Sequence, residues 1–360
     1  MIFRQLYDRD TCTFTYLIGD DWSREAVLID PVIEHLERDI SILSQLGLKL
    51  VHTLDTHAHA DHITAAAALR AKTGALVGYS RSSGVEGADR LFDDGDALRF
   101  GLQAIEVRAT PGHTSGCVTY VSASDGAAFT GDALFVRGCG RTDFQGGSAQ
   151  TLYRSVRDKI FSLPDGTLIY PGHDYKGRTV TTVQEERNFN PRLGGGRTEE
   201  QFVSIMNELD LAYPRKLDVA VPANMRCGVV GDEPIEHAAP VDADAWPVFR
   251  TPSGAPNLPA IWVAENRDRI RLIDVREPSE LSGPQGRLDG GEPVPLATVI
   301  EASKGWDKDD RLVIYCRVGG RSDKAALQLE GLGFRSVASM TGGILRWSKL
   351  GLPLAADAQG

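Results

Sequence analysis

Short apolar runs alternate with amphipathic stretches along the first 175 residues. The apolar runs, many of them β-branched, predict strands at residues 48–54, 97–100, 103–108, 117–122, 127–130 and 167–170. Helical periodicity or composition predicts helices at residues 33–46, 63–72 and 148–163. Several of the strands run straight into polar loops. An α/β unit is therefore predicted, in which side chains at the strand ends meet at one edge of a sheet.

A second alternation of strands and helices follows residue 258. Strands are predicted at residues 271–275, 311–315 and 337–339, and helices at 259–265, 297–303, 322–332 and 344–347. Six prolines between residues 231 and 259 break any regular element there. At 360 residues the chain also exceeds the usual single core. We predict two domains, residues 1–245 and 258–355, with a linker at about residues 231–257.

The composition of the chain limits the kinds of molecule that it is expected to bind. Hydrophobic residues make up 42% and charged residues 24% of the chain, as in a globular protein, and the net charge is −10. This balance argues against nucleic acid or an anionic membrane as a partner, but allows a local basic pocket for a small anion. The five cysteines lack paired spacing, and no secretory signal or membrane-length apolar run is evident. A reducing cytoplasm is expected, and the oligomeric state, a homo-oligomer included, is left open.

The highest density of potential metal ligands is in the sequence THAHADH, residues 56–62, between a predicted strand and a predicted helix. If this segment is extended, alternate side chains place His57, His59 and Asp61 on one side, while His62 opens the next turn. Imidazole and carboxylate groups packed so closely are costly to desolvate unless a cation holds them. The segment therefore predicts a metal site.

Three more potential ligands follow at the ends of predicted strands: His113 in PGHT, Asp132 in TGD and His173 in PGHDY. Together with THAHADH, these ordered motifs resemble the metallo-β-lactamase superfamily over about residues 1–245. The resemblance implies an αββα sandwich with a metal site at one edge of its sheets.

Superfamily members that bind two metal ions, such as glyoxalase II, provide one interpretation. By that resemblance one ion would be held by His57, His59 and His113. The second would be held by Asp61, His62 and His173, with Asp132 as a bridge. All seven residues are present, so a dinuclear zinc glutathione thioesterase stays an alternative.

A finer resemblance, in the segments at residues 131–147 and 224–228, is to the persulfide dioxygenases. It implies a single Fe(II) held by His57, His113 and Asp132. Two imidazoles and one carboxylate leave one face of an octahedral iron open for a sulfur ligand and O2. The surrounding residues that orient ligands and substrate would then be His59, Asp61, His62 and His173.

The same resemblance implies that glutathione persulfide is oxidised by O2 to sulfite and glutathione. Tyr175 corresponds to a glutathione-binding residue of glyoxalase II relatives, and Arg141 and Arg226 are candidates for carboxylate contacts. Either arginine could equally serve a structural ion pair. Cys139 lies between two glycines and is interpreted as a buried small residue rather than a nucleophile.

A second candidate site begins at Cys316, which ends an apolar strand and opens the sequence CRVGGRS. A glycine-rich loop and a helix start at Ser322 would direct backbone N–H groups and a helix dipole at its sulfur. Arg317 and Arg321 add positive charge. These features favour the thiolate, and hence a nucleophile.

This region, with IDVREPSE and MTGGILRW, resembles the rhodanese family over about residues 258–355 and implies a small α/β domain. The resemblance implies that Cys316 takes sulfur from thiosulfate or a persulfide and passes it to glutathione. A tyrosine-phosphatase site is a rival, but it has C-x5-R spacing, whereas Cys316 to Arg321 is C-x4-R. Another alternative is that this domain is a noncatalytic sulfur carrier or a redox sensor. Where many rhodaneses have Gly-His-Ile, residues 285–295 differ, which leaves substrate preference open.

The two resemblances together predict a bifunctional sulfur enzyme. Its metal domain would oxidise glutathione persulfide, and its second domain would transfer sulfur between thiosulfate and glutathione through a cysteine persulfide. Fusion of the two domains makes glutathione persulfide a shared intermediate, exchanged by diffusion.

Overall fold

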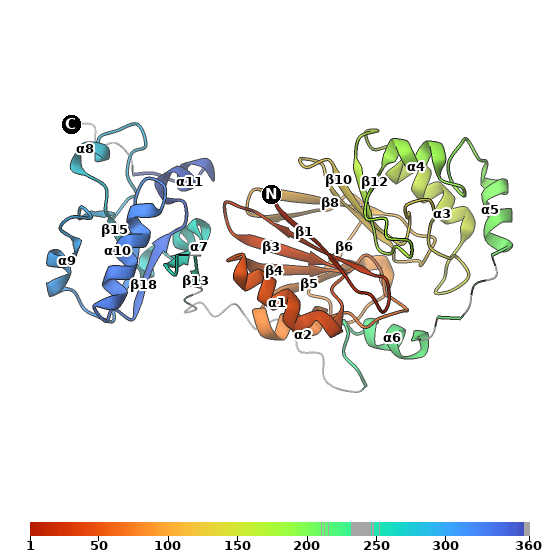
Figure 1. The fold of residues 1–360 in the computed structure, drawn as a ribbon, viewed down its shortest axis with the longest axis horizontal. Coiled ribbons are helices and arrows are strands. Elements are labelled where there is room, and N and C mark those ends of the chain that lie inside the picture. The colour runs from red at the N-terminus through yellow and green to blue at the C-terminus, as the bar shows by residue number, and fades with distance from the viewer. Residues whose placement is uncertain are drawn as a thin grey trace. The chain divides into compact units, whose positions relative to one another are not determined.

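The computed structural model describes residues 1–209, 211, 213–214, 216–231, 246, 248–251 and 253–355. They fall into two compact units, one drawn mainly from residues up to 241 and one mainly from residue 242 onward (Figure 1). Most of the predicted linker, residues 232–245, lies outside the described residues.

The first unit contains two six-stranded sheets. The first sheet has sequential order and consists of β1 (Ile2–Tyr7), β2 (Phe14–Gly19), β3 (Glu25–Ile29), β4 (Lys49–Leu54), β5 (Leu76–Ser80) and β6 (Arg90–Phe92). The second has the order β12-β11-β10-β9-β8-β7 and consists of β7 (Ala97–Phe100), β8 (Gln103–Ala109), β9 (Val118–Ser122), β10 (Ala127–Gly131), β11 (Leu168–Pro171) and β12 (Thr181–Thr182). The strands alternate buried aromatic and aliphatic residues, whose packing joins the two sheets.

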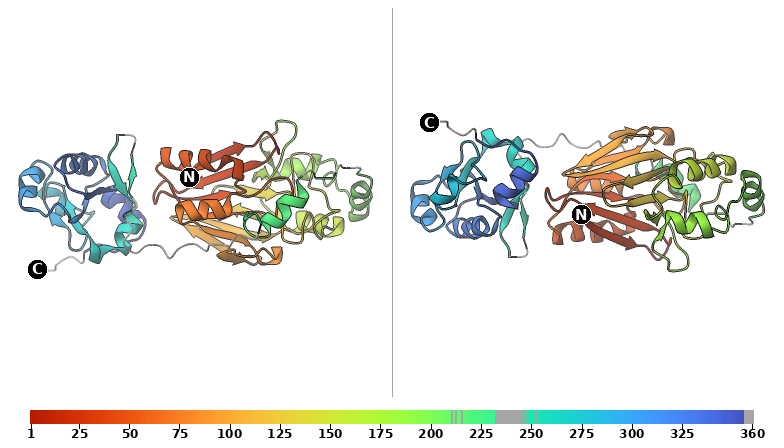
Figure 2. Two further views of the ribbon diagram at one scale, coloured as in Figure 1. Left: turned by 90° about the horizontal axis from the view of Figure 1, so that it is seen from below. Right: turned by 90° about the horizontal axis from the view of Figure 1, so that it is seen from above.

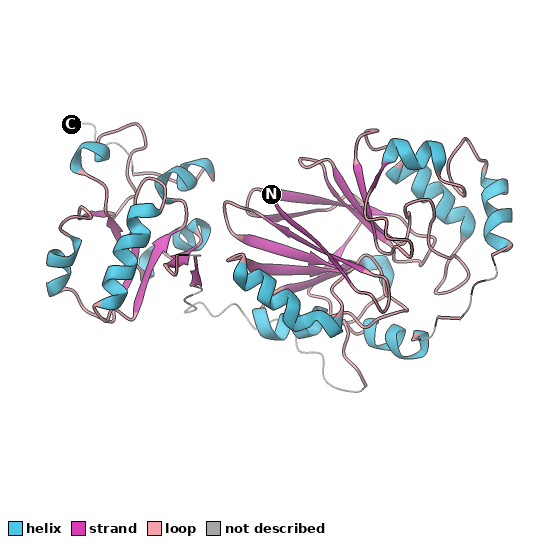
Figure 3. Ribbon diagram, in the orientation of Figure 1, coloured by secondary structure: helices cyan, strands magenta, loops and turns pink. Residues whose placement is uncertain are grey.

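Helices cover the outer faces of this sandwich (Figure 3). They are α1 (Leu36–Gln45), α2 (Ala66–Thr73), α3 (Ala149–Ser155), α4 (Val183–Phe189), α5 (Glu199–Asn207) and α6 (Leu217–Asn224). A core of Leu152, Ile169 and Phe202 joins α3 and α5 to the second sheet, and Ala66 and Val77 join α2 to the first. The views in Figure 2 show the same layers, and the predicted αββα sandwich is confirmed.

Most predicted strands of this unit are present, but two helices differ at their ends. The Ala-rich helix begins at Ala66 rather than Ile63, because the backbone of Thr64 first pairs with Val32. The helix predicted at 148–163 ends at Ser155 and continues as a π turn over Val156–Ile160. No element was predicted between residues 176 and 230, where β12, α4, α5 and α6 form. These helices are short, and α6 has an internal proline.

The second unit has one six-stranded sheet, in the order β13-β14-β18-β17-β15-β16, parallel except for the β13–β14 pair. Its strands are β13 (Phe249–Arg250), β14 (Pro256–Leu258), β15 (Arg271–Asp274), β16 (Glu292–Pro293), β17 (Arg311–Tyr315) and β18 (Ser336–Met340). Its helices are α7 (Ala260–Glu265), α8 (Pro278–Leu281), α9 (Val299–Ala302), α10 (Gly320–Gly331) and α11 (Gly343–Lys349). The predicted small, mostly parallel α/β domain is confirmed.

The sheet of this second unit begins within the stretch predicted as linker, because β13 and β14 pair before residue 258. The prolines did not prevent this pairing. Pro256 stands at the first position of β14, a place in a strand where a missing N–H group is tolerated.

A buried ion pair fixes the loop that follows β15. Arg276 contacts Asp274 at 2.7–3.0 Å and donates to the Gly286 carbonyl at 2.9 Å, and both charged side chains are 1% exposed. This pair explains the DVRE sequence physically: the arginine is a structural anchor, and a carboxylate buried without it would be costly.

We predict that Arg276→Met destabilises the second unit by about 3–5 kcal/mol, because Asp274 is left as an unpaired buried charge. Urea unfolding of the full chain followed by tryptophan fluorescence measures this, since four of the five tryptophans lie at positions 246, 262, 306 and 347. Arg335→Met, at an exposed ion pair with Asp309, is the matched control and should cost less than about 1 kcal/mol. Equal midpoints for the two variants would contradict the assignment.

Candidate metal centre and sulfur-transfer site

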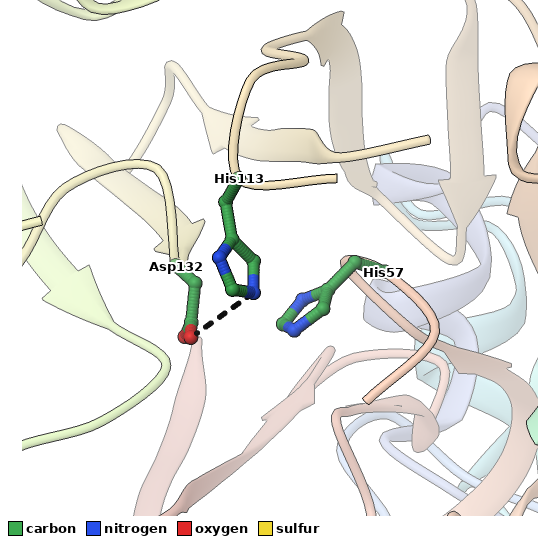
Figure 4. Close-up of side chains that lie close together, drawn as sticks. All are labelled: His57, His113 and Asp132. Carbon is green, nitrogen blue, oxygen red and sulfur yellow. Dashed lines mark ion pairs between the residues drawn. The ribbon is translucent and has the colours of Figure 1, made fainter. Parts of the chain in front are cut away.

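Three predicted ligands from different loops meet in the first unit. His57 follows β4, His113 lies between β8 and β9, and Asp132 follows β10. One potential ligand atom from each lies within 4.8 Å of the others, and His113 Nε2 is 3.5 Å from Asp132 Oδ2 (Figure 4). His57 and Asp132 are buried, and His113 is half-buried.

Hydrogen bonds on the far side of each ring fix which nitrogen faces this cluster. Thr56 Oγ1 donates to Asp30 at 2.9 Å and can therefore accept the Nδ1–H of His57 at 3.0 Å. His113 donates its Nδ1–H to the Arg141 carbonyl at 2.7 Å. Both rings consequently turn Nε2 inward, and a neutral ring that donates from Nδ1 has its lone pair on Nε2, which is the arrangement that metal-binding histidines need.

The charge states fit a cation as well. Burial of the ring is the main reason why the pKa of His57 lies well below its usual value, and the neighbouring His59 is the second. Burial alone would raise the pKa of Asp132, but the charge of His173 and its hydrogen bond to Asp132 outweigh burial and lower that pKa. A neutral His57 imidazole and an ionised Asp132 carboxylate are protonation states that bind a divalent transition metal.

The expectation that His57, His59 and Asp61 converge on one point is met in part: His59 and Asp61 belong to one group, whereas His57 groups with His113 and Asp132. The chain bends after β4 instead of staying extended, and His59 turns to Asp30, with 3.1 Å between Nε2 and Oδ1. Burial would lower the pKa of His59, but Asp30 and Asp55 outweigh it and raise that pKa to about 9. His59 groups with Asp61 and His62, and its ring centroid lies 4.1 Å from that of His57.

His173 lies between two carboxylates. Its Nδ1 is 2.7 Å from Asp132 Oδ1, and its Nε2 is 3.0 Å from Asp61 Oδ2. Burial would lower the pKa of His173, but Asp132 and Asp61 outweigh it and raise that pKa well above its usual value. His173 therefore links the cluster of His57, His113 and Asp132 to the group around Asp61.

Asn224, at the end of α6, clamps the histidine-rich loop and was not foreseen. It is fully buried; its Nδ2 donates to the carbonyls of His59 and His62 at 2.9 and 2.8 Å, and its Oδ1 accepts from the Thr64 amide at 2.9 Å. Its place in the NMRCG segment is the available signal, although the sequence analysis assigns a role there to Arg226, two residues further on. Arg226 does not line the cavity at the cluster, and it donates to the Gly231 carbonyl.

A cavity of about 530 Å³ opens over the cluster, and two of the predicted substrate-binding residues line it. Tyr175 is 68% exposed and stacks parallel to the His173 ring. Arg141 pairs with both oxygens of Asp143 at 2.6 and 2.7 Å. Cys139 also lines the cavity, but it is 3% exposed and burial raises the pKa of its thiol to about 11, as suits a structural residue.

In the second unit, Cys316 lies between β17 and α10, as predicted. The Gly319 amide donates to its Sγ at 3.1 Å, and Ser322 Oγ is 3.5 Å away. Burial opposes the thiolate, but hydrogen bonds from the Ser322 hydroxyl and the loop amides outweigh it and lower the pKa of Cys316. This is the environment of a nucleophilic sulfur.

The two arginines of this loop differ in their surroundings. Arg321 forms a two-pronged ion pair with Glu280 at 2.5 and 2.8 Å, whereas Arg317 is exposed. The MTGG segment packs directly under the loop: a Cβ on Gly343 would lie 2.3 Å from the Cys316 carbonyl. Only glycine permits that approach.

Comparisons with known proteins agree with both sites. Residues 13–173 match the metallo-β-lactamase superfamily, and residues 260–350 match the rhodanese-like domain. The human mitochondrial persulfide dioxygenase ETHE1 is 56% identical over 230 residues, which are 64% of this chain and 89% of that protein. The chain belongs to the persulfide dioxygenase family. The mouse protein of the same name is 55% identical over the same shares of both chains.

Solved structures of this superfamily show the same fold. The crystal structure of ETHE1 from Myxococcus xanthus is 52% identical, has a TM-score of 0.62, and matches 63% of this chain and all of that chain. A Staphylococcus aureus metallo-β-lactamase covers 95% of this chain with a TM-score of 0.59, but at 22% identity it shows likeness of fold alone. Within the described residues, no helix is long and apolar enough to cross a bilayer.

We predict that Asn224→Ala lowers the free energy of unfolding by about 2–4 kcal/mol and weakens metal binding, because three buried backbone groups lose their partner. Urea unfolding of the metal-free chain and metal titration measure the two effects. Asn207→Ala, at the exposed end of α5, should change stability by less than about 0.5 kcal/mol. An Asn224→Ala variant as stable as that control would rule out the clamp.

We predict that Cys316 is alkylated by iodoacetamide with a midpoint below pH 9. The thiolate is the reacting form, so the rate rises as pH rises through the lowered pKa and falls below it. Residue-resolved mass spectrometry separates Cys316 from the other cysteines. Ser322→Ala should move the midpoint upward, since a donor to the sulfur is lost; a midpoint at or above 9 in the unaltered chain would refute the prediction.

Proposed function

We propose that the first unit oxidises glutathione persulfide with O2 and water to sulfite and glutathione, using one Fe(II) held by His57, His113 and Asp132. The observation that carries this proposal is the inward-facing set of two Nε2 atoms and one carboxylate, in a chain of the persulfide dioxygenase family. The reaction balances as GSSH + O2 + H2O → GSH + SO3²⁻ + 2H⁺, where GSSH is glutathione persulfide.

Bound iron would supply the site at which the persulfide sulfur and O2 react, since three ligands on one face leave the other open. The chain itself does the remaining work. Thr56 and Asp30 hold the His57 ring, and the Arg141 carbonyl holds that of His113. Burial of the cluster keeps bulk water from competing for the charged groups.

The cavity suits a flexible anionic substrate such as glutathione. Tyr175 offers an exposed ring and hydroxyl beside His173, and Lys176 supplies a cation at the lining. Arg141 also lines the cavity, although its guanidinium already pairs with Asp143. We assign Tyr175 and Arg141 to glutathione binding, and Arg226, which does not line the cavity, has no assigned role there.

We propose that the second unit transfers sulfur between thiosulfate and glutathione. The Cys316 thiolate would attack the outer sulfur of thiosulfate, and sulfite would leave with the electron pair of the broken S–S bond. A glutathione thiolate would then attack the outer sulfur of the cysteine persulfide, which regenerates Cys316. Loop amides stabilise the negative sulfur, and Arg317 and Arg321 provide positive charge for the anionic donor. Glutathione persulfide would pass between the sites by diffusion.

A dinuclear zinc glutathione thioesterase is the second candidate. One observation favours it: His59 Nδ1 and His62 Nε2 are buried and have no hydrogen-bond partner in the described part of the chain. Buried nitrogens without partners are available to a second cation. Metal content distinguishes the two candidates.

We expect the purified chain to bind about one iron and to consume one O2 per glutathione persulfide. Cys316→Ser should abolish thiosulfate:glutathione sulfur transfer and leave O2 uptake near normal, because the two sites are separate. Iron analysis, an oxygen electrode and a sulfite assay measure these results. Two zinc ions per chain with no oxygen uptake would favour the thioesterase, and transfer that persists in Cys316→Ser would exclude this cysteine as the nucleophile.

We also propose a reducing, cytoplasmic setting. All five cysteines are free thiols in the structure. The human and mouse relatives are mitochondrial by name.

A further inference from the structure

A buried serine in β18 is connected to the Cys316 site through Ser322. Ser339 Oγ donates to Ser322 Oγ at 2.8 Å, and Ser322 Oγ lies 3.5 Å from Cys316 Sγ. Ser322 and Ser339 are both fully buried, and Cys316 is 1% exposed. The three side chains therefore form a short chain of hydrogen bonds that ends at the sulfur. The sulfur transfer proposed above gives Ser339 no role.

The sheet of the second unit fixes the position of Ser339. Its register partners are Ile314 in β17 and Asn257 in β14, so β18 is paired on both sides at this point. Val337, two positions earlier and hence on the same face of the strand, belongs to the core that α10 forms with β15 and β17. Ser339 therefore faces α10, and Ser322 lies in the first turn of that helix.

The place of Ser339 is one where an apolar side chain would be expected. Residues 337, 338 and 340 of the same strand are apolar and buried. A hydroxyl buried among such residues is costly unless a hydrogen bond satisfies it. In the described part of the chain, the Ser339 hydroxyl makes that bond to Ser322. The polar side chain at this position thus acts on the residue that contacts the Cys316 sulfur.

The bond from Ser339 limits what Ser322 can do with its own hydrogen. Ser322 has one O–H hydrogen and two acceptors within reach, the Gly319 carbonyl oxygen at 2.8 Å and Cys316 Sγ at 3.5 Å. Because Ser322 accepts from Ser339, its hydrogen is donated to one of these two acceptors. An ionised sulfur favours the bond to itself, and a hydroxyl that accepts a hydrogen bond donates its own hydrogen more strongly.

We propose that Ser339 is a positioning residue for sulfur transfer, which donates to Ser322 and thereby strengthens the hydrogen bond from Ser322 to the Cys316 thiolate. This inference rests on the sulfur transfer proposed for the second unit. It extends the site from the loop of backbone amides to the strand beneath α10.

The charged groups around the sulfur are separate from this chain of hydrogen bonds. Arg317 lies in the loop and Arg321 in the first turn of α10, and Arg321 pairs with Glu280 of α8 at 2.5 and 2.8 Å. The five residues of β18, all of them described, include no titratable side chain. A substitution at Ser339 therefore removes a hydrogen bond to Ser322 and changes no charge.

The test is a double-mutant cycle read by the pH midpoint of Cys316 alkylation with iodoacetamide, measured on the full-length chain by residue-resolved mass spectrometry. Ser322→Ala should raise the midpoint by about 1 pH unit, because a hydrogen bond to the thiolate is lost. Ser339→Ala should raise it by about 0.3 unit, because that bond is only weakened. In a chain that already carries Ser322→Ala, Ser339→Ala should add less than about 0.1 unit, because its effect passes through Ser322.

Ser303→Ala is the matched control. Ser303 is also 1% exposed in the second unit, and its hydroxyl donates to the Ile300 carbonyl at 2.9 Å. Its loss should leave the midpoint of Cys316 unchanged. A shift in this variant as large as that of Ser339→Ala would overturn the inference, because general loosening of the unit would then explain both.

Two further results would overturn the inference: an unchanged midpoint in a folded Ser339→Ala chain, or the same shift from Ser339→Ala with and without Ser322. If circular dichroism shows that Ser339→Ala does not fold, Ser339→Cys, a weak donor of similar size, takes its place under the same criteria. Failure of the proposed function is distinguishable. An unaltered chain that transfers no sulfur from thiosulfate to glutathione would refute sulfur transfer, whatever the alkylation midpoints are.

Discussion

The metal cluster depends on hydrogen bonds that face away from it. Asp30, at the end of β3, has a backbone φ of 51° and accepts from the Thr56 amide at 2.7 Å, the Thr56 hydroxyl at 2.9 Å and His59 Nε2 at 3.1 Å. Through Thr56 it sets the tautomer of His57, and it holds the Nε2 atom of His59, whose ring lies 4.1 Å from that of His57. One buried carboxylate thus decides which nitrogens face the position of the cation.

The charge of His173 connects the proposed metal ligand Asp132 to Asp61, which belongs to a separate group of potential ligands. His173 bridges Asp132 and Asp61, so that buried negative charge is neutralised by a protein cation as well as by any bound metal. The presence of seven potential ligand residues therefore does not mean that all seven can bind a metal ion. The identity of each atom's hydrogen-bond partner, rather than the presence of the residue, determines which atoms can coordinate.

The same logic applies to the second unit with different groups. Cys316 sits at a strand end, as the metal ligands do, but there backbone amides rather than imidazoles select its ionised form. Glycines allow the supporting segments to approach, as Gly343 does beneath the Cys316 carbonyl. The buried Asp274–Arg276 pair keeps the neighbouring loop in place. In both units, chemistry at the strand ends relies on rigid backbone just beneath it.

The sequence by itself determined the two α/β units and most of their strands, because buried strands are local patterns. The set of His57, His113 and Asp132 came from the resemblance of its ordered motifs to the persulfide dioxygenases. The sequence also located the site at Cys316, because the amides around this sulfur belong to residues that follow it directly in the chain. Only the tertiary structure decided that His59 turns to Asp30, that Asn224 clamps the histidine-rich loop, and that Arg226 lies away from the cavity. Those outcomes depend on hydrogen bonds between residues up to 165 positions apart, which no local pattern encodes.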